Sequence, residues 1–278
     1  MADRQYRRQG AVVAAGVVVC VGVGGCGSGG AVLDDGPGGE RERVEVVRGA
    51  AAELVEARSA KARTSMEMAS GGTRVTIRGE GVYDFRRQVG RLKVLLPQDP
   101  AGATAHRPIT ELLSPGALFM KNRGAGVPAD KWVRVETASM PDGNLVTGGA
   151  TDPYAAAEVL LGARSVSYAG EEEVGGAEVT HYRGTADLRL AAEHASEGSR
   201  EALAAAAKGF ATAKVPFDVY LDDEGRIRKI RHRFSFVNGQ REGAVAVAST
   251  ILLLDFGVAV DVRLPERDDI YAGRIAEE

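Results

Sequence analysis

The spacing of apolar residues changes near Thr64 from the period of a helix to that of a strand. Between Glu40 and Arg63, apolar residues recur at helical spacing with charges between them, at Val44, Val47, Ala51, Leu54, Val55 and Ala62. This pattern predicts an amphipathic helix with one buried stripe. From Thr64 onward, apolar and polar residues alternate in short runs separated by glycine-bearing turns, which predicts antiparallel strands.

The alternating runs continue almost to the end of the chain. They lie at residues 64–69, 73–85, 90–97, 109–122, 131–136, 165–188, 215–238 and 249–265. Two helices interrupt them: one over 152–163, where Asp152 caps the helix and Pro153 stands in its first turn, and an alanine-rich one over 199–211. Runs of strands with few helices indicate an antiparallel α+β fold in one domain without internal repeats.

The hairpin at 215–238 shows which side of this sheet is apolar. Phe217, Val219 and Leu221 share one face of the first strand, and Phe234 and Phe236 share one face of the second. Charged residues occupy the opposite positions. The sheet is therefore expected to be apolar on one side and solvated on the other.

The N-terminus has the pattern of an export signal. Arg4, Arg7 and Arg8 precede a short uncharged stretch, Ala11–Gly25, which is shorter than the roughly 20 apolar residues that span a bilayer. A basic head, a short apolar body and small residues at its end are typical of a secretory signal peptide, here residues 1–25.

The end of this stretch, Val23-Gly24-Gly25-Cys26, resembles the lipobox of bacterial lipoproteins. The resemblance implies cleavage before Cys26 and attachment of diacylglycerol, with chains such as palmitate, to its thiol. Cys20 follows three valines and fits less well, and an ordinary signal peptide or an uncleaved anchor stays open. Two acyl chains hold a protein on a membrane without spanning it. Glycine-rich residues 26–39 would form a flexible tether, and residues 40–278 the folded domain.

Composition removes several classes of function. Cys20 and Cys26 are the two cysteines, so a processed chain has neither an internal disulfide nor a thiolate zinc site. Loss of the leader, with Asp3 against three arginines, changes the formal charge from −3 to about −5. Nucleic acid is not expected as a partner, since it requires a basic face.

Residues that usually carry chemistry are sparse. His106, His181, His194 and His232 lie in different predicted elements without metal-ligand spacing, and the chain has no phosphate loop, nucleophile elbow or zinc signature. The acidic runs at 221–225 and 170–176 are typical of turns, although the first also permits calcium. Trp132 is expected to pack on a neighbouring strand. We therefore expect no enzyme, no metal site and no cofactor.

The run "RIRKIRHR" at 226–233 is locally basic. On a strand it places Lys229, Arg231 and Arg233 on the solvated face. These cations would either pair with acidic residues nearby or meet anionic lipid headgroups.

Seven segments occur in an order that resembles a known family. They are the lipobox, the helix before the first strand, "GEGVYDF", "ALFMK…KWVRV", "DPYAAAEVLLGA", "GEEEVGGAEVTHYRGTADL" and "VPFDVYLDDEGRIRKIRHRF". Together they resemble the LppX/LprG lipoproteins of actinobacteria, relatives of the LolA and LolB carriers. The resemblance implies a strongly curved antiparallel half-barrel with helices on its concave face, enclosing an apolar cavity for an acylated lipid or lipoglycan.

Eight residues are expected to form the wall of that cavity: Phe217, Val219, Leu221, Phe234, Phe236, Leu252, Leu254 and Phe256. The protein would be a monomer, exported and lipid-anchored on the outer face of the cytoplasmic membrane, and would bind or transport its ligand noncovalently. Two alternatives stay open. One is a lipoprotein with a filled core whose surface binds an envelope protein; the other is a hydrolase with an unrecognised site.

Overall fold

Eleven strands form one antiparallel sheet in this computed structural model, which describes residues 37–70, 73–97, 107–124, 126–237 and 244–273. Their order across the sheet is β6-β5-β4-β3-β2-β1-β11-β10-β9-β8-β7. The strands are β1 (Ser59–Ser70), β2 (Thr73–Asp84), β3 (Val89–Leu95), β4 (Ile109–Ser114), β5 (Ala117–Lys121), β6 (Val133–Glu136), β7 (Ala163–Val174), β8 (Ala177–Asp187), β9 (Lys214–Leu221), β10 (Ile227–Val237) and β11 (Ala244–Leu254).

Two meanders meet at the centre of this sheet. The chain runs outward from β1 to β6, crosses to the other edge, and returns from β7 to β11. The ladder between β1 and β11, from Lys61↔Leu254 to Ala69↔Ala246, joins the two halves. Because β6 and β7 are consecutive strands at opposite edges, residues 137–162 must pass across one face of the sheet.

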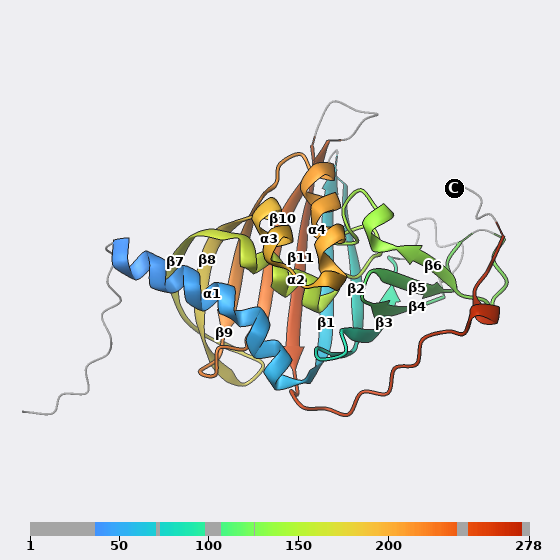
Figure 1. Cartoon of the computed structure of the whole chain (residues 1–278), viewed down its shortest axis with the longest axis horizontal. Helices are drawn as coiled ribbons and strands as arrows, with labels where there is room; N and C mark the ends of the chain where they lie inside the picture. The colour runs from blue at the N-terminus through green and yellow to red at the C-terminus, as the bar shows by residue number, and fades with distance from the viewer. Residues whose placement is uncertain (1–36, 71–72, 98–106, 125, 238–243, 274–278) are drawn as a thin grey trace, which may run out of the picture. The chain divides into compact units, whose positions relative to one another are not determined.

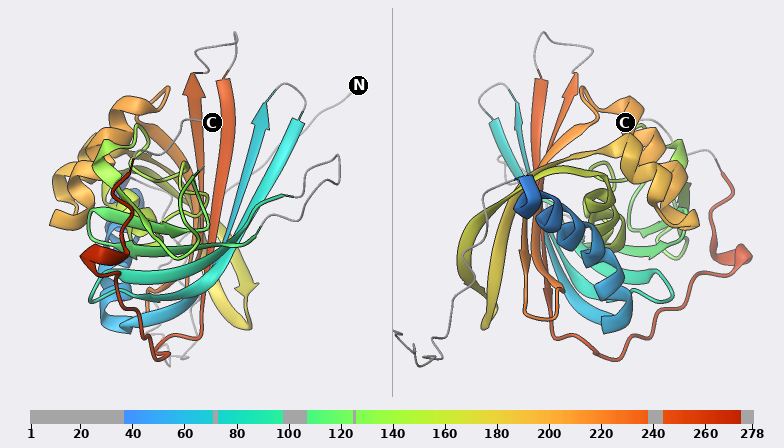
Figure 2. Two further views of the ribbon diagram at one scale, coloured as in Figure 1. Left: turned by 90° about the vertical axis from the view of Figure 1, so that its right-hand side faces the viewer. Right: turned by 60° about the vertical axis from the view of Figure 1, so that its left-hand side comes forward.

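All the α-helices lie on that same face, and the sheet curves around them (Figures 1 and 2). They are α1 (Pro37–Ala57), α2 (Pro153–Val159), α3 (Leu188–His194) and α4 (Glu197–Gly209), with short 3₁₀ turns η1 (Thr137–Ser139), η2 (Leu160–Gly162) and η3 (Arg267–Asp269). The expected α+β half-barrel with helices on the concave face is confirmed. No helix in the described ranges is both long and apolar enough to cross a bilayer.

The first helix ends earlier than its apolar spacing predicts. Arg58 adopts a φ of 69°, a left-handed conformation that commonly terminates helices. Its carbonyl accepts a hydrogen bond from the Phe85 amide at 2.8 Å. Ala62, expected on the helical stripe, therefore belongs to β1, where it is buried.

The last strand also ends earlier than expected. Asp255 has a φ of 49°, and residues after Leu254 continue without regular strand pairing along the sheet's other, outer face. There Val262 packs with Phe119 and the partly buried Trp132. Trp132 packs beside Phe119 of the neighbouring strand β5, as expected, and also forms an isolated bridge with Ile270.

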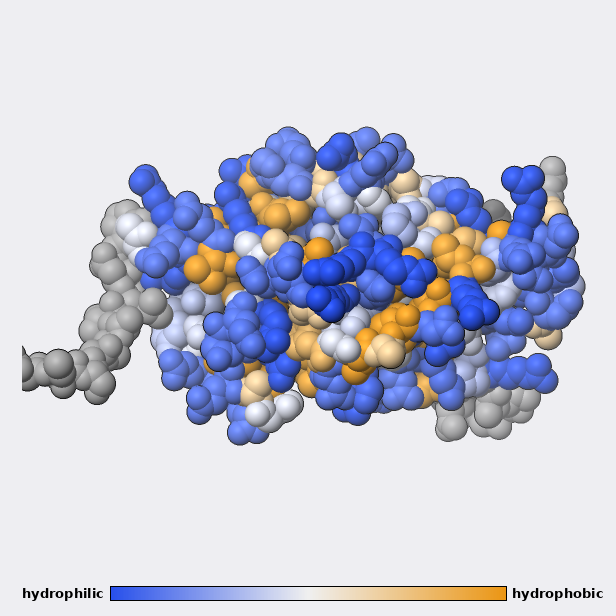
Figure 3. Space-filling view, turned by 60° about the horizontal axis from the view of Figure 1, so that its bottom comes forward, coloured by the Kyte–Doolittle hydropathy of each residue, from blue (hydrophilic) through white to orange (hydrophobic). Residues whose placement is uncertain are grey.

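The space between sheet and helices holds one continuous apolar core. Phe217 is fully buried there, and its ring lies over Gly184 of the adjacent strand, where a Cβ would come within 2.5 Å of the ring. The side of the molecule that carries α1 and the C-terminal segment is mostly hydrophilic, with separate small apolar areas (Figure 3).

Truncating a core side chain should therefore lower the free energy of unfolding far more than truncating a surface side chain. We expect Phe217→Ala to lower the free energy of unfolding by about 3–5 kcal/mol. Leu95→Ala, at a side chain 46% exposed, should lower it by less than about 0.5 kcal/mol. Urea denaturation of both variants measures the difference, and equal losses would contradict this description of the core.

Candidate functional site

The inner face of the sheet, against the helices, is the candidate site. Phe217, Val219 and Leu221 of β9 and Phe234 of β10 are buried in the core on this face, as the alternation predicts. Phe236 is half-buried against the same core. These five residues form a wall, and in this structure the helices cover it.

The expected residues of β11 lie on the wrong face. Leu252 packs with Val174, Val179 and Tyr220 on the outer side of the sheet, and Leu254, two residues on, shares its side of the strand. The inward positions are instead Val247, Ser249, Ile251 and Leu253. The run Ile251–Leu254 has no apolar–polar alternation, so the sequence alone does not fix its register.

Phe256 lies beyond the end of β11 and outside the sheet's alternation. Its half-buried ring touches the core and is faced by the guanidinium groups of Arg226 and Arg228, whose central carbons lie 4.8 and 5.2 Å from its centroid. Cation–π contacts of this kind fix the ring where the sheet ends.

The helices that cover the wall differ in what they present. Alanine predominates among the buried residues of α3 and α4, which are Leu188, Ala191, Ala192, Ser199, Ala202, Leu203, Ala206 and Ala207. α1 and α2 bury larger side chains as well, among them Val47, Leu54, Tyr154 and Val159. The part of the cover that α3 and α4 form is therefore thinner than the part that α1 and α2 form.

Four buried polar side chains interrupt the apolar interior. Among the described residues, Thr64 Oγ1, both carboxylate oxygens of Glu111, both amide atoms of Asn144 and His232 Nε2 have no hydrogen-bond partner. A buried polar group left without a partner costs about 1–3 kcal/mol. These four side chains are therefore the candidates in the interior for hydrogen bonds to a bound molecule.

Glu111 is the most unusual of these groups. It projects from β4 into the core beside Gly149, whose Cβ position lies 3.7 Å from Glu111 Oε1. Burial raises the pKa of Glu111 to about 8, against a smaller opposing effect of the Arg123 charge. The carboxyl group is therefore neutral at pH 7 and is able to donate a hydrogen bond.

The loop at 140–151, which the sequence pattern did not single out, closes this part of the interior. The buried carboxylate of Asp142 organises it by accepting hydrogen bonds from the amides of Val146 and Thr147 at 2.7 and 2.6 Å. Thr151 Oγ1 lies 2.6 Å from Ser249 Oγ of β11, which connects the loop to the centre of the sheet.

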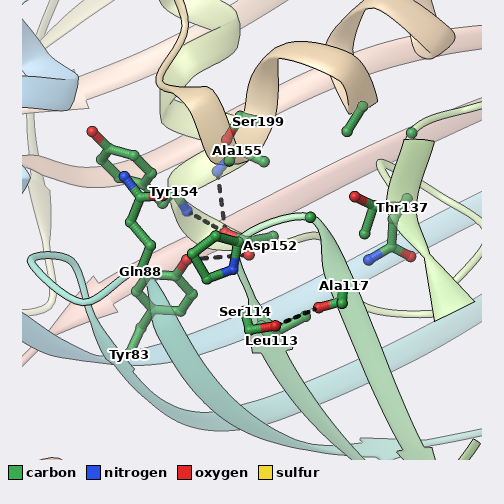
Figure 4. Close-up of a pocket in the computed structure, with 16 residues that line it drawn as sticks. Tyr83, Gln88, Leu113, Ser114, Ala117, Thr137, Asp152, Tyr154, Ala155 and Ser199 are labelled. Carbon is green, nitrogen blue, oxygen red and sulfur yellow. Dashed lines mark hydrogen bonds between the residues drawn. The ribbon is translucent and has the colours of Figure 1, made fainter. Parts of the chain in front are cut away.

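A small pocket opens between this loop, the β4–β5 turn and the first turns of α2 and α4 (Figure 4). Its volume is about 30 Å³, room for about two water molecules. Asp152 accepts hydrogen bonds from the Tyr154 and Ala155 amides, as expected of a helix cap. Its other oxygen accepts one from Tyr83 Oη at 3.1 Å.

Two polar side chains at this pocket, those of Asp152 and Ser114, are engaged in structure, whereas the Asn144 side chain that also lines it has no partner among the described residues. Burial raises the pKa of Asp152 to about 6, although the amide and tyrosine hydrogen bonds oppose the change. Ser114 Oγ donates to the carbonyl of Ala117 at 3.2 Å. The pocket is thus small and has a mixed polar and apolar lining.

The three histidines in the described ranges lie in different elements and on different faces. His181, on the outer face, contacts Asp218 at 2.8 Å and Glu172 at 3.1 Å. His232 lies inside the core, where burial lowers its pKa to about 3, so it is neutral at pH 7. His194 is exposed on α3, and His106 lies outside the described residues.

The acidic and basic runs mostly pair with each other. Asp222, Asp223 and Glu224 offer oxygens within 4.8 Å of one another, but Asp222 accepts from the Arg226 amide and side chain at 2.9 and 3.0 Å, as a turn requires. Arg233 donates to Asp218 at 2.7 Å. In the run at 170–176, residues 170–174 pair with β8 as the end of β7, and Gly175 and Gly176 form the turn between the two strands.

Asp218 is the acidic centre of this outer network. Burial raises its pKa, but hydrogen bonds from His181, Arg183 and Arg233 outweigh that effect and lower the pKa to about 2. Arg231 lies 3.8 Å from Glu67. Pairing with neighbouring acids therefore accounts for Arg231 and Arg233 of the basic run.

No protein-family model matches the chain, and no curated protein matches its sequence. Solved structures that it resembles include the lipoprotein LppX of Mycobacterium tuberculosis, at 10% identity over 80% of this chain and 99% of that chain, with a TM-score of 0.49. LprF of Mycobacterium bovis matches at 13% identity over 81% and 97%, with a TM-score of 0.39. A LolA superfamily protein of Nitrosomonas europaea matches at 11% identity over 77% and 94%, with a TM-score of 0.35.

These structures come from the groups that the sequence resembles. The likeness concerns the fold, and what this chain binds depends on its own side chains.

The buried carboxyl group should make stability depend on pH. Glu111 binds a proton up to about pH 8 when folded, against an ordinary pKa of 4.5, so the folded state holds more protons between these values. Stability should therefore fall as pH rises from about 4.5 to 8 and then level off. Glu111→Gln should remove this pH dependence. The variant should become more stable than the native protein as pH rises across that window, by on the order of a few kcal/mol.

Urea denaturation between pH 5 and 9 tests this, with the exposed Glu80→Gln as the matched control. If both variants follow the native pH profile, Glu111 is not buried in its neutral form.

Proposed function

We propose that this chain is an exported envelope lipoprotein that holds an acylated lipid noncovalently between the inner face of its sheet and its helices. The observation that carries the proposal is the contrast between the two sides of the core. Large apolar side chains line the sheet, whereas α3 and α4 cover it mainly with the methyl groups of alanine, beside Leu188 and Leu203. An acyl chain needs a dry apolar enclosure without oriented polar groups.

Exchange of α3 and α4 for a lipid would expose apolar surface on both sides of the interface. Burial of apolar surface contributes about 0.8 kcal/mol per methylene, so the alanine methyl groups of these helices would account for less of the lost burial than the large side chains of the sheet. The acyl chain would then cover the same sheet residues. Binding would require the helices to shift, since the pocket at this interface measures about 30 Å³.

The buried polar groups support the same proposal. Glu111 and Asn144 lie near adjacent glycines of the covering loop, Gly149 and Gly148 respectively. A neutral carboxyl and a primary amide together offer donors and acceptors for an ester or hydroxyl group of a bound lipid. Hydrogen bonds to such a group would satisfy atoms that have no partner in the closed conformation.

One observation favours a second candidate, a protein-binding lipoprotein with a filled core. Phe217, Val219 and Leu221 are at most 2% exposed, which is also what a solidly packed core would show. The two functions differ in what they predict for lipid uptake.

Enlarging the inner wall should increase lipid uptake. Phe234→Ala removes a ring that stacks on Phe210 with centroids 4.7 Å apart, so it creates space between sheet and helices. Offered a fluorescent fatty acid, this variant should retain several-fold more than the native protein.

The matched control is Phe119→Ala, which removes a buried ring from the outer face and should leave uptake unchanged. Equal uptake by both variants, or none by any form, would favour the filled core.

The anchor is a separate part of the proposal. Cys26 lies outside the described residues, and Cys26→Ser should move the protein from the membrane fraction to the soluble fraction of the source cell, because two acyl chains provide the attachment. Cys20→Ser serves as the control and should stay membrane-bound. Retention of the Cys26→Ser protein in the membrane would overturn this assignment.

A further inference from the structure

The outer face of the sheet carries a groove that the proposed lipid site does not use. It crosses β11, β1, β2 and β3 and has a volume of about 310 Å³, which is at the lower end of the range for ligand pockets. Leu95 and Leu252 are among its lining residues, and Leu95 is 46% exposed. Few large hydrophobic side chains among the described residues are as exposed as Leu95.

The strand register places two rows of side chains across this groove. The first row runs Leu252, Arg63, Glu80 and Lys93 from β11 to β3, and the second runs Thr250, Ser65, Arg78 and Leu95. The side chains of Ser65 and Thr250 are short, so the surface is hollowed where these two residues pair. The longer side chains of the two rows surround this hollow, with Leu252 and Leu95 at its opposite ends.

The groove is positively charged although the chain as a whole is negative. Arg63, Arg78 and Lys93 surround it and are exposed, and Glu80 is the single acid among its lining residues. The first row continues to Lys229 on β10, opposite Leu252. Within the described residues, no ion pair shorter than 4.0 Å involves Arg63, Arg78 or Lys93. The whole sequence has a formal charge of −3, so cations are concentrated here.

Neighbouring parts of the outer face are already occupied. Over β4 to β6, the C-terminal segment packs Val262 against Leu112 and Phe119. Toward β7 and β8, Glu171, Glu172 and Glu173 make the surface acidic. The groove is the part of this face that is both open and basic.

We propose that this groove docks the protein on an anionic phospholipid surface. Arg63, Arg78 and Lys93 would contact lipid phosphates, while Leu95 and Leu252 would contact the acyl region just below them. Basic side chains are attracted strongly to an anionic bilayer. Apolar side chains strengthen the binding further because they are buried in the bilayer interface. A single-stranded nucleic acid would call for aromatic side chains on which bases stack, and the groove lining contains none.

This docking is independent of lipid binding on the inner face, which lies on the opposite side of the sheet. It would place the basic face against the bilayer and leave the helical side away from it. If Cys26 carries the proposed anchor, the stretch from Cys26 to Pro37 reaches at most about 40 Å when extended. Docking would then hold the domain in one orientation at that membrane.

Vesicle co-sedimentation tests the proposal. The full chain carrying Cys26→Ser is mixed with phosphatidylcholine vesicles and with vesicles containing one quarter phosphatidylglycerol. The groove variant adds Arg63→Gln, Arg78→Gln and Lys93→Gln, and the control variant adds Arg41→Gln, Arg189→Gln and Lys208→Gln, three exposed cations on the helices. All forms keep the same N-terminal segment, so its contribution cancels in the comparison.

Binding to the anionic vesicles should fall by about fivefold per cation removed from the groove, hence roughly a hundredfold for the groove variant. The control should change by less than about twofold, and 0.5 M salt should remove the difference between the variants. Thermal melting of each variant establishes that it is folded, and Leu95→Gln, with no change of charge, should lower binding by a few-fold.

Equal losses in the groove and control variants would mean that net charge alone is responsible, and would overturn the proposal. Binding of the parent chain that does not depend on phosphatidylglycerol would also overturn it, and would leave the groove to an acidic protein partner.

Discussion

The pairing of β1 with β11 is the constraint on which the rest of the structure depends. Nine residue pairs, from Lys61↔Leu254 to Ala69↔Ala246, join two meanders that otherwise share no ladder in the described sheet. This pairing puts β6 and β7 at opposite edges. The chain must therefore cross one whole face between them, and the loop at 140–151 and α2 cover the inner face because the topology sends them there.

The crossing segment also explains the unusual interior. To lie close to the sheet and to α4 it uses small residues, and Gly143 comes so near Ala202 that a Cβ would lie 2.0 Å from the carbonyl oxygen. The same close approach seals Glu111 and Asn144 away from water without giving them partners. The proposed exchange of this cover for a ligand rests on the large side chains of the sheet, the alanine of α3 and α4, and the unpaired polar groups between them.

Much of the fold follows from the sequence, because alternation is strong where one face of a strand is buried. The hairpin of β9 and β10 places Phe217, Val219, Leu221 and Phe234 as the alternation requires. In β11 the four residues Ile251–Leu254 are all apolar, so their pattern does not show which of them face the core. The expectation that Leu252 and Leu254 face the core is therefore wrong. α1 and β11 end just before Arg58 and Asp255, which adopt positive φ values. A glycine at these positions would have indicated such a conformation in the sequence, whereas arginine and aspartate do not.

The site was less predictable than the fold for a different reason. Glu111 lies in an ordinary-looking strand, and its burial depends on the loop at 140–151, which has no periodic pattern of its own. The groove on the outer face likewise depends on register across β1, β2 and β3 and on the pairing of β1 with β11, which is distant in sequence. Local patterns do not contain such information.

The central claim is that the inner face holds a lipid in the cell. It is tested most directly by native mass spectrometry of the full-length protein purified from its source cell, followed by extraction with organic solvent. A covalent anchor survives extraction, whereas a bound lipid does not. The account predicts a stoichiometric adduct that is lost on extraction and recovered as an acylated lipid. An unchanged mass before and after extraction, with no uptake of added lipids, would contradict it.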